Sequence, residues 1–196
     1  MKRGGKFFML TTRFEEALTY ATRLHSAQVR KGSNTPYIAH LLGVASIALE
    51  NGADEDEAIA ALLHDAVEDQ GGAATRAEVH RRFGARVAAI VDGCTDAEVT
   101  PKPPWRARKE AYIRHLAEAS ASVRLVSASD KLYNARSILH DYRILGEDLW
   151  QRFTGGRDGT LWYYRALVEA YRAHGRTPLT DELERTVLEL ERLAAI

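Results

Sequence analysis

The sequence has a single cysteine, Cys94, in 196 residues. One cysteine excludes an internal disulfide and a zinc site built from several thiolates. Long apolar runs are also missing, since no stretch approaches the roughly 20 residues that a membrane-spanning helix needs. The apolar part of the N-terminal segment stops at Thr11, short of the about 7–15 residues of a signal-peptide core. These absences predict a cytoplasmic protein that does not act at a membrane.

An excess of charge of either sign is absent as well. The chain carries 27 Lys and Arg residues and 27 Asp and Glu residues, so its formal net charge at pH 7 is zero. Bulk binding of nucleic acid or of an anionic membrane uses a basic surface, so the composition argues against both, although it leaves room for local patches. We therefore expect no nucleic-acid partner, and the sequence leaves the oligomeric state open.

Alternation of apolar and polar residues, the pattern of half-buried strands, is nowhere clear. Apolar residues instead recur three and four positions apart, which is typical of amphipathic helices. The length suits a single domain over residues 1–196. We predict an all-α fold in which the helices form one orthogonally packed bundle. The expected helices cover about 12–29, 36–50, 54–69, 75–84, 85–93, 105–119, a long segment from 122, 160–174 and 181–196.

Helix-end signals suggest several of these boundaries. Thr12 and Thr75 are each followed three residues later by glutamate, the spacing of a capping box in which the threonine is the N-cap. Asp54 and Glu57 are expected to cap the third helix. Gly84 should end the helix that Thr75 begins. Two stretches rich in proline or glycine are expected to be loops, 95–104 and 153–159.

The most unusual stretch is residues 64–69, His-Asp-Ala-Val-Glu-Asp, which directly follows an apolar run. We expect it to continue the same buried helix. Residues four apart share a helix face, so His64 should lie under Glu68. In the same way, Asp65 should lie under Asp69. Charges at the end of an apolar helix are costly to bury unless a metal or another partner compensates them.

Two further polar residues, His40 and Asp130, interrupt apolar helices. Each alone has an ordinary explanation, because a histidine on an apolar face is usually a core residue and a helical aspartate is usually solvated or paired. Together with His64 and Asp65 they form a set of two imidazoles and two carboxylates. Such mixed ligation suits manganese, iron, cobalt or zinc better than calcium. Nearby carboxylates could then hold or deprotonate a water molecule at the ion.

With these residues the sequence resembles the HD-domain metal-dependent phosphohydrolases. It is most similar to the hydrolase domain of the RelA/SpoT family, and the absence of a synthetase or regulatory region makes it resemble the stand-alone branch, the small alarmone hydrolases. The resemblance covers a core of about 12–174 and leaves the last helix, about 181–196, outside. The motifs that carry it are Arg30-Lys31-Gly32, Pro36-Tyr37-Ile38-Ala39-His40, His64-Asp65-Ala66-Val67-Glu68-Asp69, Phe83-Gly84 and Asp130-Lys131-Leu132-Tyr133-Asn134.

The resemblance implies an HD-type helical bundle and a manganese-dependent hydrolysis. The reaction would remove the 3′-pyrophosphate from ppGpp or pppGpp, a small-molecule nucleotide, and give GDP or GTP and pyrophosphate. By this resemblance, the metal would be bound by His40, His64, Asp65 and Asp130. The attacking water would be positioned and deprotonated by Glu68 and Asp69. The nucleotide would be contacted by Arg30, Lys31, Asn134 and Ser137.

Two positions depart from the family pattern. Leu41 follows the first metal histidine where the family often has proline, which should affect only helix geometry. Ser137 stands where the family often has threonine. Because serine keeps the hydroxyl, we expect little loss from this second difference.

Other hypotheses fit the same residues. An HD-type enzyme could use the site on another phosphate ester, such as the 2′-phosphate of NADPH or a nucleoside monophosphate. A non-catalytic nucleotide sensor could use the same pocket, although a sensor needs no carboxylates such as Glu68 and Asp69. Arg30 and Lys31 alone would suit a solvated loop end. The aromatic run 162–164 suits the core. A basic cluster suits either a solvated helix face or attraction of a polyphosphate: Lys102, Arg106, Arg108 and Lys109.

Overall fold

A computed structural model describes residues 9–96, 101 and 103–194. Helices make up most of this part, and no strand occurs within it. The predicted all-α class is therefore confirmed. The elements are α1 (Thr12–Leu24), α2 (Ile38–Glu50), α3 (Glu55–Leu63), α4 (Ala66–Asp69), α5 (Ala73–Phe83), α6 (Ala85–Cys94), α7 (Trp105–Glu118), α8 (Ala121–Leu145), the 3-10 helix η1 (Gly146–Arg152), α9 (Gly156–Arg172) and α10 (Pro178–Ala194).

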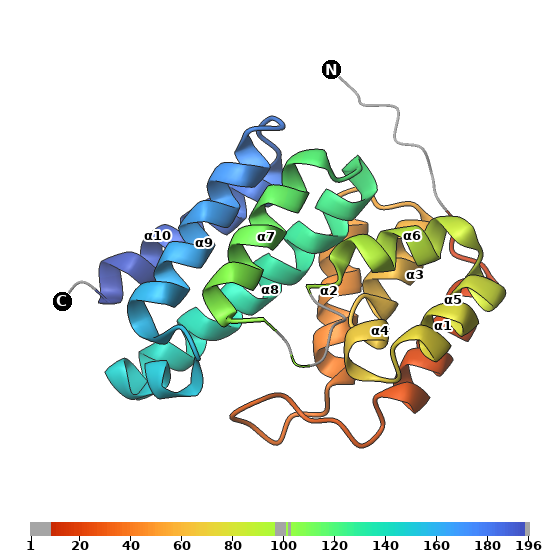
Figure 1. The fold of residues 1–196 in the computed structure, drawn as a ribbon, viewed down its shortest axis with the longest axis horizontal. Helices are drawn as coiled ribbons and strands as arrows, with labels where there is room; N and C mark the ends of the chain where they lie inside the picture. Colours follow the sequence, from red (N-terminus) through yellow and green to blue (C-terminus); the bar gives the residue numbers. More distant parts are fainter. Residues whose placement is uncertain (1–8, 97–100, 102, 195–196) are drawn as a thin grey trace.

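The 25-residue helix α8 runs through the middle of the molecule (Figure 1). The helices α2, α3 and α6 pack against α8 from one side, and α9, α10 and η1 pack against it from the other. No helix in the described part of the chain is long and apolar enough to cross a membrane. Because α8 contacts both groups of helices, any residue on its middle turns lies where the two groups meet.

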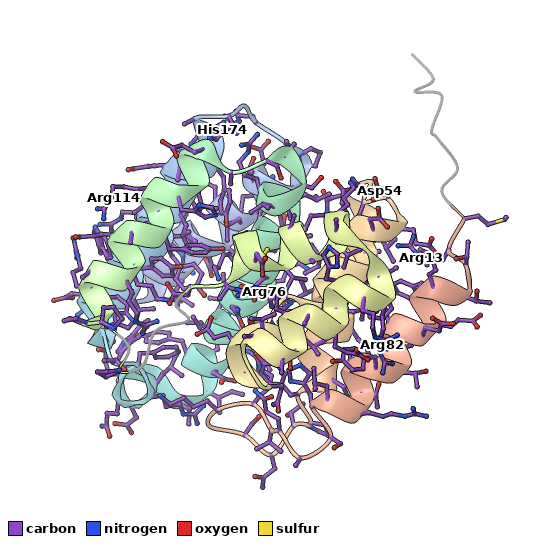
Figure 2. All side chains as sticks on the ribbon, turned by 45° about the vertical axis from the view of Figure 1, so that its right-hand side comes forward. Arg13, Asp54, Arg76, Arg82, Arg114 and His174 are labelled. Carbon is purple, nitrogen blue, oxygen red and sulfur yellow. The ribbon has the colours of Figure 1, made fainter. Side chains whose placement is uncertain are left out.

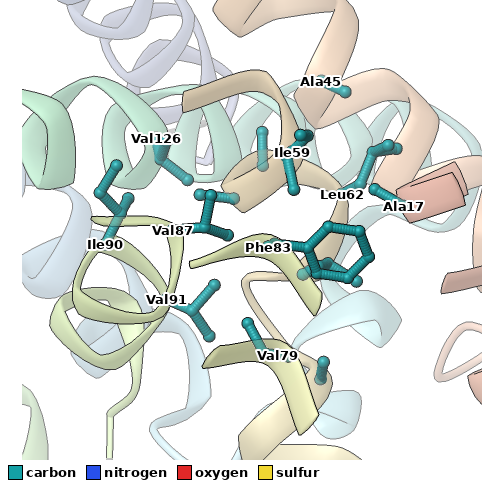
Figure 3. Packing of buried hydrophobic residues seen from close by; sticks show 14 of the residues in the cluster. Ala17, Ala45, Ile59, Leu62, Val79, Phe83, Val87, Ile90, Val91 and Val126 are labelled. Carbon is teal, nitrogen blue, oxygen red and sulfur yellow. The ribbon is translucent and has the colours of Figure 1, made fainter. Parts of the chain in front are cut away.

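One hydrophobic cluster surrounds α3, in which all side chains from Ala58 to Leu63 are buried. Its three alanines let neighbouring helices approach closely, and α1, α2 and α6 all pack on it. Figure 3 shows Ile59 of α3 packed with Phe83 of α5 and Val87 of α6. This packing fixes the end of α3, where the His64-Asp65 pair follows.

A second cluster joins α8 to α7, η1, α9 and α10. Tyr163 and Tyr164 of α9 are buried in it, in line with the expected core role of this aromatic run. The last helix, α10, contributes Leu183 and Leu190, which are fully buried. Leu125 of α8 packs against both clusters.

Several predicted helix ends agree with the structure and others are wrong. The Asp54–Glu57 capping box is present at the start of α3. Gly84 ends α5 with a φ of 91°, a backbone conformation that glycine adopts easily. The Thr12 box is wrong, because the N-cap is Thr11, whose hydroxyl accepts a hydrogen bond from the Arg13 N–H. Consequently, Thr12 is the first helical residue.

The helix predicted to run to residue 29 ends at Leu24. Beyond it the chain turns to form a single antiparallel bridge between Val29 and Pro36, which closes the loop 30–35 at its base. This loop carries Arg30 and Lys31.

Two other helix starts differ from the predictions. Thr75 is not an N-cap: α5 begins two residues earlier, after Gly72, and the Thr75 hydroxyl donates to the Gln70 carbonyl. The helix expected from residue 122 begins at Ala121 with Ser120 as its N-cap. In both cases the residue that precedes the helix lies earlier in the chain, three positions before Thr75 and two before residue 122.

Of the two expected loops, the stretch 153–159 is mostly wrong. Residues 156–159 form the first turn of α9. Gly155 and Gly159 lie against the indole of Trp105, where a Cβ would come within 3.3 Å of ring atoms. These glycines therefore serve close packing rather than a loop. Within 95–104, the described residues 95, 96, 101, 103 and 104 are non-helical, and the others lie outside the described residues.

Candidate active site

The helix predicted to run through 64–69 is interrupted. The helix α3 ends at Leu63, α4 covers Ala66–Asp69, and His64 and Asp65 form the turn between them. Asp65 has φ −98° and ψ −2°. The interruption lets two adjacent side chains converge, although consecutive residues of a regular helix point about 100° apart. The His64 Nε2 and Asp65 Oδ2 atoms are 3.0 Å apart.

Four candidate ligand atoms meet at this turn. The His40 Nε2 atom of α2 lies 3.3 Å from His64 Nε2 and 3.5 Å from Asp65 Oδ2. The Asp130 Oδ1 atom of α8 lies 3.3 Å from His40 Nε2 and 3.6 Å from His64 Nε2. All four predicted metal ligands are thus brought together. They come from α2, the α3–α4 turn and the middle of α8.

The donor set and its spacing suit a divalent cation. Metal–ligand bonds of about 2.1 Å at octahedral or tetrahedral angles separate neighbouring ligand atoms by about 3.0–3.4 Å. The observed separations, 3.0–3.6 Å, fall close to this range. His40, His64 and Asp130 are 1%, 3% and 6% exposed. Two carboxylates beside the same two buried histidines need positive charge to compensate them.

Hydrogen bonds prepare the imidazole of His64 for a metal. Its Nδ1 lies 2.9 Å from the Ala61 carbonyl, which can only accept, so Nδ1 carries the proton. Nε2 is then left to face the other ligands with its lone pair. In the protein without metal, burial opposes the imidazolium, but the Asp65 and Asp130 carboxylates outweigh burial and raise the pKa of His64 well above its ordinary value.

The two ligand carboxylates have fixed partners of their own. The Tyr37 hydroxyl donates to Asp65 Oδ2 at 2.6 Å, and burial together with this carboxylate raises the pKa of Tyr37, so it remains a donor. The Lys131 ammonium donates to Asp130 Oδ2 and the Asn134 amide to Asp130 Oδ1, both at 2.6 Å. Burial opposes ionisation of Asp130, yet Lys131 and the two histidines hold its pKa well below its usual range.

The two carboxylates that follow the metal ligands are held from opposite sides. The main-chain N–H of Asp96 donates to Glu68 Oε2 at 3.2 Å. The Gln28 amide donates to Asp69 Oδ2 at 2.8 Å. Burial raises the pKa of Asp69, and the neighbouring Asp65 and Glu68 charges raise it further. A carboxylate with a raised pKa is a better proton acceptor than an ordinary one.

A pocket of about 880 Å³ adjoins the candidate metal centre. It is lined by Tyr37, Lys131 and Asn134, the residues that bond the two ligand carboxylates. Among the described residues, its lysine and arginine side chains outnumber its single carboxylate, Asp141, by six to one. The six are Arg30, Lys31, Lys109, Lys131, Arg136 and Arg152. A pocket with this charge suits a polyanionic ligand.

All four residues predicted to contact a nucleotide line this pocket: Arg30, Lys31, Asn134 and Ser137. The Arg30 guanidinium donates to Asn134 Oδ1 at 3.1 Å and lies 5.3 Å from the ring centre of Tyr133. The Ser137 hydroxyl donates to the Tyr133 carbonyl at 3.1 Å, so in this state it serves its own helix. A bound nucleotide would have to share or replace that bond.

Several site residues were not identified from the sequence. Tyr37 and Lys131 stand inside the quoted motifs, so their positions beside His40 and Asp130 could have suggested them. Gln28 and Asp96 gave no such signal, because their contacts with Asp69 and Glu68 span 41 and 28 residues.

The described residues of the predicted basic cluster make different contacts. Lys109 lines the pocket, whereas Arg106 pairs with Glu110 and lies over the Trp162 ring. Arg108 pairs with Asp96. Lys102 lies outside the described residues. Of the described members of the cluster, only Lys109 therefore lines the pocket, while Arg106 forms a surface ion pair and Arg108 a partly buried one.

The chain is similar to known proteins of one family. The family model described as HD domain matches residues 17–161, and these residues contain all four candidate metal ligands. The chain belongs to the HD-domain family. The family assignment agrees with the helical architecture and with the resemblance seen in the sequence.

Two relatives and one solved structure are similar to this chain. The guanosine-3′,5′-bis(diphosphate) 3′-pyrophosphohydrolase MESH1 of Xenopus tropicalis is 41% identical over 126 residues, which cover 63% of this HD-domain chain and 68% of the relative. The Homo sapiens protein of the same name is 39% identical over the same shares. A solved structure described as a metazoan ortholog of SpoT that hydrolyzes ppGpp superposes with a TM-score of 0.79 at 27% identity, over 95% of this chain and 99% of that one.

Proposed function

We propose that this protein is a metal-dependent hydrolase that removes the 3′-pyrophosphate from ppGpp or pppGpp, giving GDP or GTP and pyrophosphate. The observation that carries the proposal lies beside a basic pocket: ligand atoms of His40, His64 and Asp65 converge there, and Asp130 Oδ1 lies 3.3 and 3.6 Å from the two histidine Nε2 atoms. The relatives named as 3′-pyrophosphohydrolases support it, because they are 41% and 39% identical to this chain over 126 residues.

The proposed metal ligands are His40, His64, Asp65 and Asp130. Two imidazoles and two carboxylates suit manganese or another first-row divalent ion, and we propose Mn²⁺ as the cofactor. When bound, such an ion lowers the pKa of water and draws charge from a phosphoryl oxygen. The chain's own contribution is to hold the ligands in place, through Tyr37 on Asp65 and Lys131 on Asp130.

Glu68 and Asp69 are the proposed proton acceptors. Water attacks the phosphorus atom bonded to the 3′ oxygen, one carboxylate takes the proton of that water, and the bond from phosphorus to the 3′ oxygen breaks. The 3′ oxygen then gains a proton and pyrophosphate leaves. The raised pKa of Asp69 supports a role in this proton transfer, since a base works best when its pKa approaches the working pH.

The cations of the pocket are proposed to bind the phosphates. Arg30 and Lys31 lie on the loop 30–35, which the Val29–Pro36 bridge holds beside α8. Lys109 and Lys131 line the same pocket. Positive charge around a transferred phosphoryl group stabilises the charge that develops as the bond breaks. The nucleoside is proposed to lie along α8, near Asn134 and Ser137.

We also propose that residues 1–196 form one hydrolase domain. The helix α8 contributes to both hydrophobic clusters, and Asp130 lies on α8 at the point where they meet. The residues at the site come from helices of both clusters. Separating the clusters would therefore divide the site itself.

The test is an assay of the purified protein with ppGpp and NADPH side by side, with Mn²⁺ or with a chelator. Released pyrophosphate and phosphate are measured separately. We expect pyrophosphate from ppGpp, and its loss with chelator. Phosphate from NADPH alone would show that the site acts on a different nucleotide. Tight ppGpp binding without turnover would instead support a sensor.

A further inference from the structure

Asp96, two residues after the end of α6, contacts both walls of the site. Its main-chain N–H donates to Glu68 on α4 at 3.2 Å. Its carboxylate accepts a hydrogen bond of 2.8 Å from the Lys109 ammonium and another from Arg108, both on α7. The Asp96 side chain is only 13% exposed. One residue therefore joins a proposed proton acceptor to a pocket-lining cation.

These two walls belong to different parts of the core. The helix α4 packs on α5 and α6, within the cluster around α3. The helix α7 packs on α9, within the second cluster. Packing alone thus sets the position of Glu68 and the position of Lys109 from different neighbours. The two hydrogen bonds of Asp96 couple the position of Glu68 to the position of Lys109.

Without its hydrogen bond to Asp96, the side chain of Lys109 would be poorly fixed in the pocket. Its side chain has four rotatable bonds, and its ammonium reaches into a pocket that already holds the Lys131 charge. Burial lowers the pKa of Lys109, and repulsion from Lys131 lowers it further. A short charge-assisted hydrogen bond to Asp96 opposes both effects and fixes the ammonium 4.9 Å from the ring centre of Tyr163.

We propose that Asp96 is a positioning residue that sets Lys109 relative to Glu68, so that the cation faces the departing pyrophosphate while the carboxylate faces the attacking water. This inference rests on the proposed function, because it gives both side chains their roles. Asp96 itself touches neither substrate nor metal in it. An alternative role for Asp96 is only to tie the end of α6 to α7.

A double-mutant cycle separates these roles. The proteins are the parent, Asp96→Ala, Lys109→Ala and the double variant, all as full chains with Mn²⁺ and ppGpp. Asp96→Ala should raise KM about tenfold, as the loss of a hydrogen bond to a charged group predicts. Lys109→Ala should do the same, and the KM of the double variant should be no higher than that of Lys109→Ala alone. Asp96→Ala should also lower kcat several-fold, because Glu68 is then held less firmly and an imperfectly placed base transfers the proton less efficiently.

Asp92→Asn is the matched control. Asp92 lies on the last turn of α6 and pairs at 2.6 Å with Arg76, a surface residue labelled in Figure 2, and it does not line the pocket. This variant loses an ion pair near the same helix end, so it should keep the parent's KM and kcat. If Asp96→Ala unfolds, Asp96→Asn takes its place, because it keeps the shape of the side chain and removes only its charge.

Two results would overturn the inference. Unchanged KM and kcat in a folded Asp96 variant would leave only the tie between α6 and α7. Effects on KM that multiply in the double variant would show that Asp96 does not act through Lys109. If the parent released no pyrophosphate, the proposed function would be wrong, and titration of the same four proteins with inorganic pyrophosphate would test the link. Equal pyrophosphate affinity in the parent and Asp96→Ala would then overturn it.

Discussion

The Gln28 amide donates a hydrogen bond of 2.8 Å to the Asp69 carboxylate. The orientation of this amide is set from its other end, because Gln28 Oε1 accepts from the Gln70 amide and lies 2.7 Å from His25 Nδ1. The nitrogen of the amide must therefore face Asp69. Since Gln28 and Asp69 are 41 residues apart, this contact also joins the segment after α1 to α4.

The first prediction concerns this contact. Gln28→Ala should lower kcat about tenfold and leave metal content unchanged, because Asp69 loses its orienting donor. Burial raises the pKa of Asp69 and the Gln28 hydrogen bond lowers it. Removing the bond should therefore raise the pKa and move the acidic limb of the rate profile to higher pH. The measurement is kcat against pH.

The exposed glutamine Gln151 provides the control for this experiment, because its amide donates only to Asp148 at 3.5 Å. Gln151→Ala should reproduce the parent's profile. An acidic limb at the same pH in Gln28→Ala and in the parent would mean that Asp69 is not the group that titrates.

The second prediction concerns protons released by metal binding. Without metal, the carboxylates of Asp65 and Asp130 overcome the burial of His64 and raise its pKa well above the ordinary value. A divalent ion must displace that proton to reach Nε2. Affinity for Mn²⁺ should therefore rise with pH while His64 is protonated in the metal-free protein. Binding heats measured in buffers of different ionisation enthalpy should show about one proton released per ion.

His115→Ala is the control for proton release, because the His115 ring bonds the Gly93 carbonyl and is not part of the candidate metal centre. It should release the same number of protons as the parent. Identical heats in all buffers, for parent and control alike, would contradict a protonated His64.

The sequence predicted which side chains lie together at the candidate metal centre better than the backbone that presents them. His40, His64 and Asp130 are polar residues in apolar runs, so their types and order carry the signal. The interruption between α3 and α4 was missed, because the apolar periodicity continues through Ala66 and Val67, which are indeed buried. Local spacing reports which residues are buried, but not where a helix turns so that two neighbours can converge.

Glycine patterns misled in a related way. Around residue 155 they suggested a loop, but the space beside Gly155 and Gly159 is filled by Trp105, some 50 residues earlier in the chain. The contacts of Gln28 with Asp69 and of Asp96 with Glu68 also join distant parts of the sequence, 41 and 28 residues apart. Such contacts follow from how the helices pack, and no local pattern records them.

The third prediction concerns Gly43, on α2. A Cβ at this position would overlap the ring of Tyr133, which lies against His40 with ring centres 5.0 Å apart and supports Arg30. Gly43→Ala should therefore lower the free energy of unfolding by about 1–3 kcal/mol, as overpacking does. It should also reduce activity, because Tyr133 must move. Chemical denaturation and steady-state kinetics measure the two effects.

A second background tests the cause of this loss. Once Tyr133→Ala has removed the ring, Gly43→Ala should stabilise the protein by up to about 1 kcal/mol, because alanine favours a helix interior over glycine. A loss of the same size in both backgrounds would show that the ring of Tyr133 is not the obstacle.

The fourth prediction separates chemistry from binding. Glu68→Gln keeps an oxygen that can accept from the Asp96 N–H but cannot accept a proton, so kcat should fall by about 10²–10⁴ while metal content and KM stay near those of the parent. Lys31→Ala removes a pocket cation and should raise KM about tenfold with little change in kcat. Steady-state kinetics with metal analysis measure both effects. Arg81→Ala, which removes an exposed cation paired with Glu78, should change neither kcat nor KM.

Parental turnover in Glu68→Gln would assign proton transfer to Asp69 alone. A fall in kcat without a change in KM in Lys31→Ala would instead place that cation at the reacting phosphate.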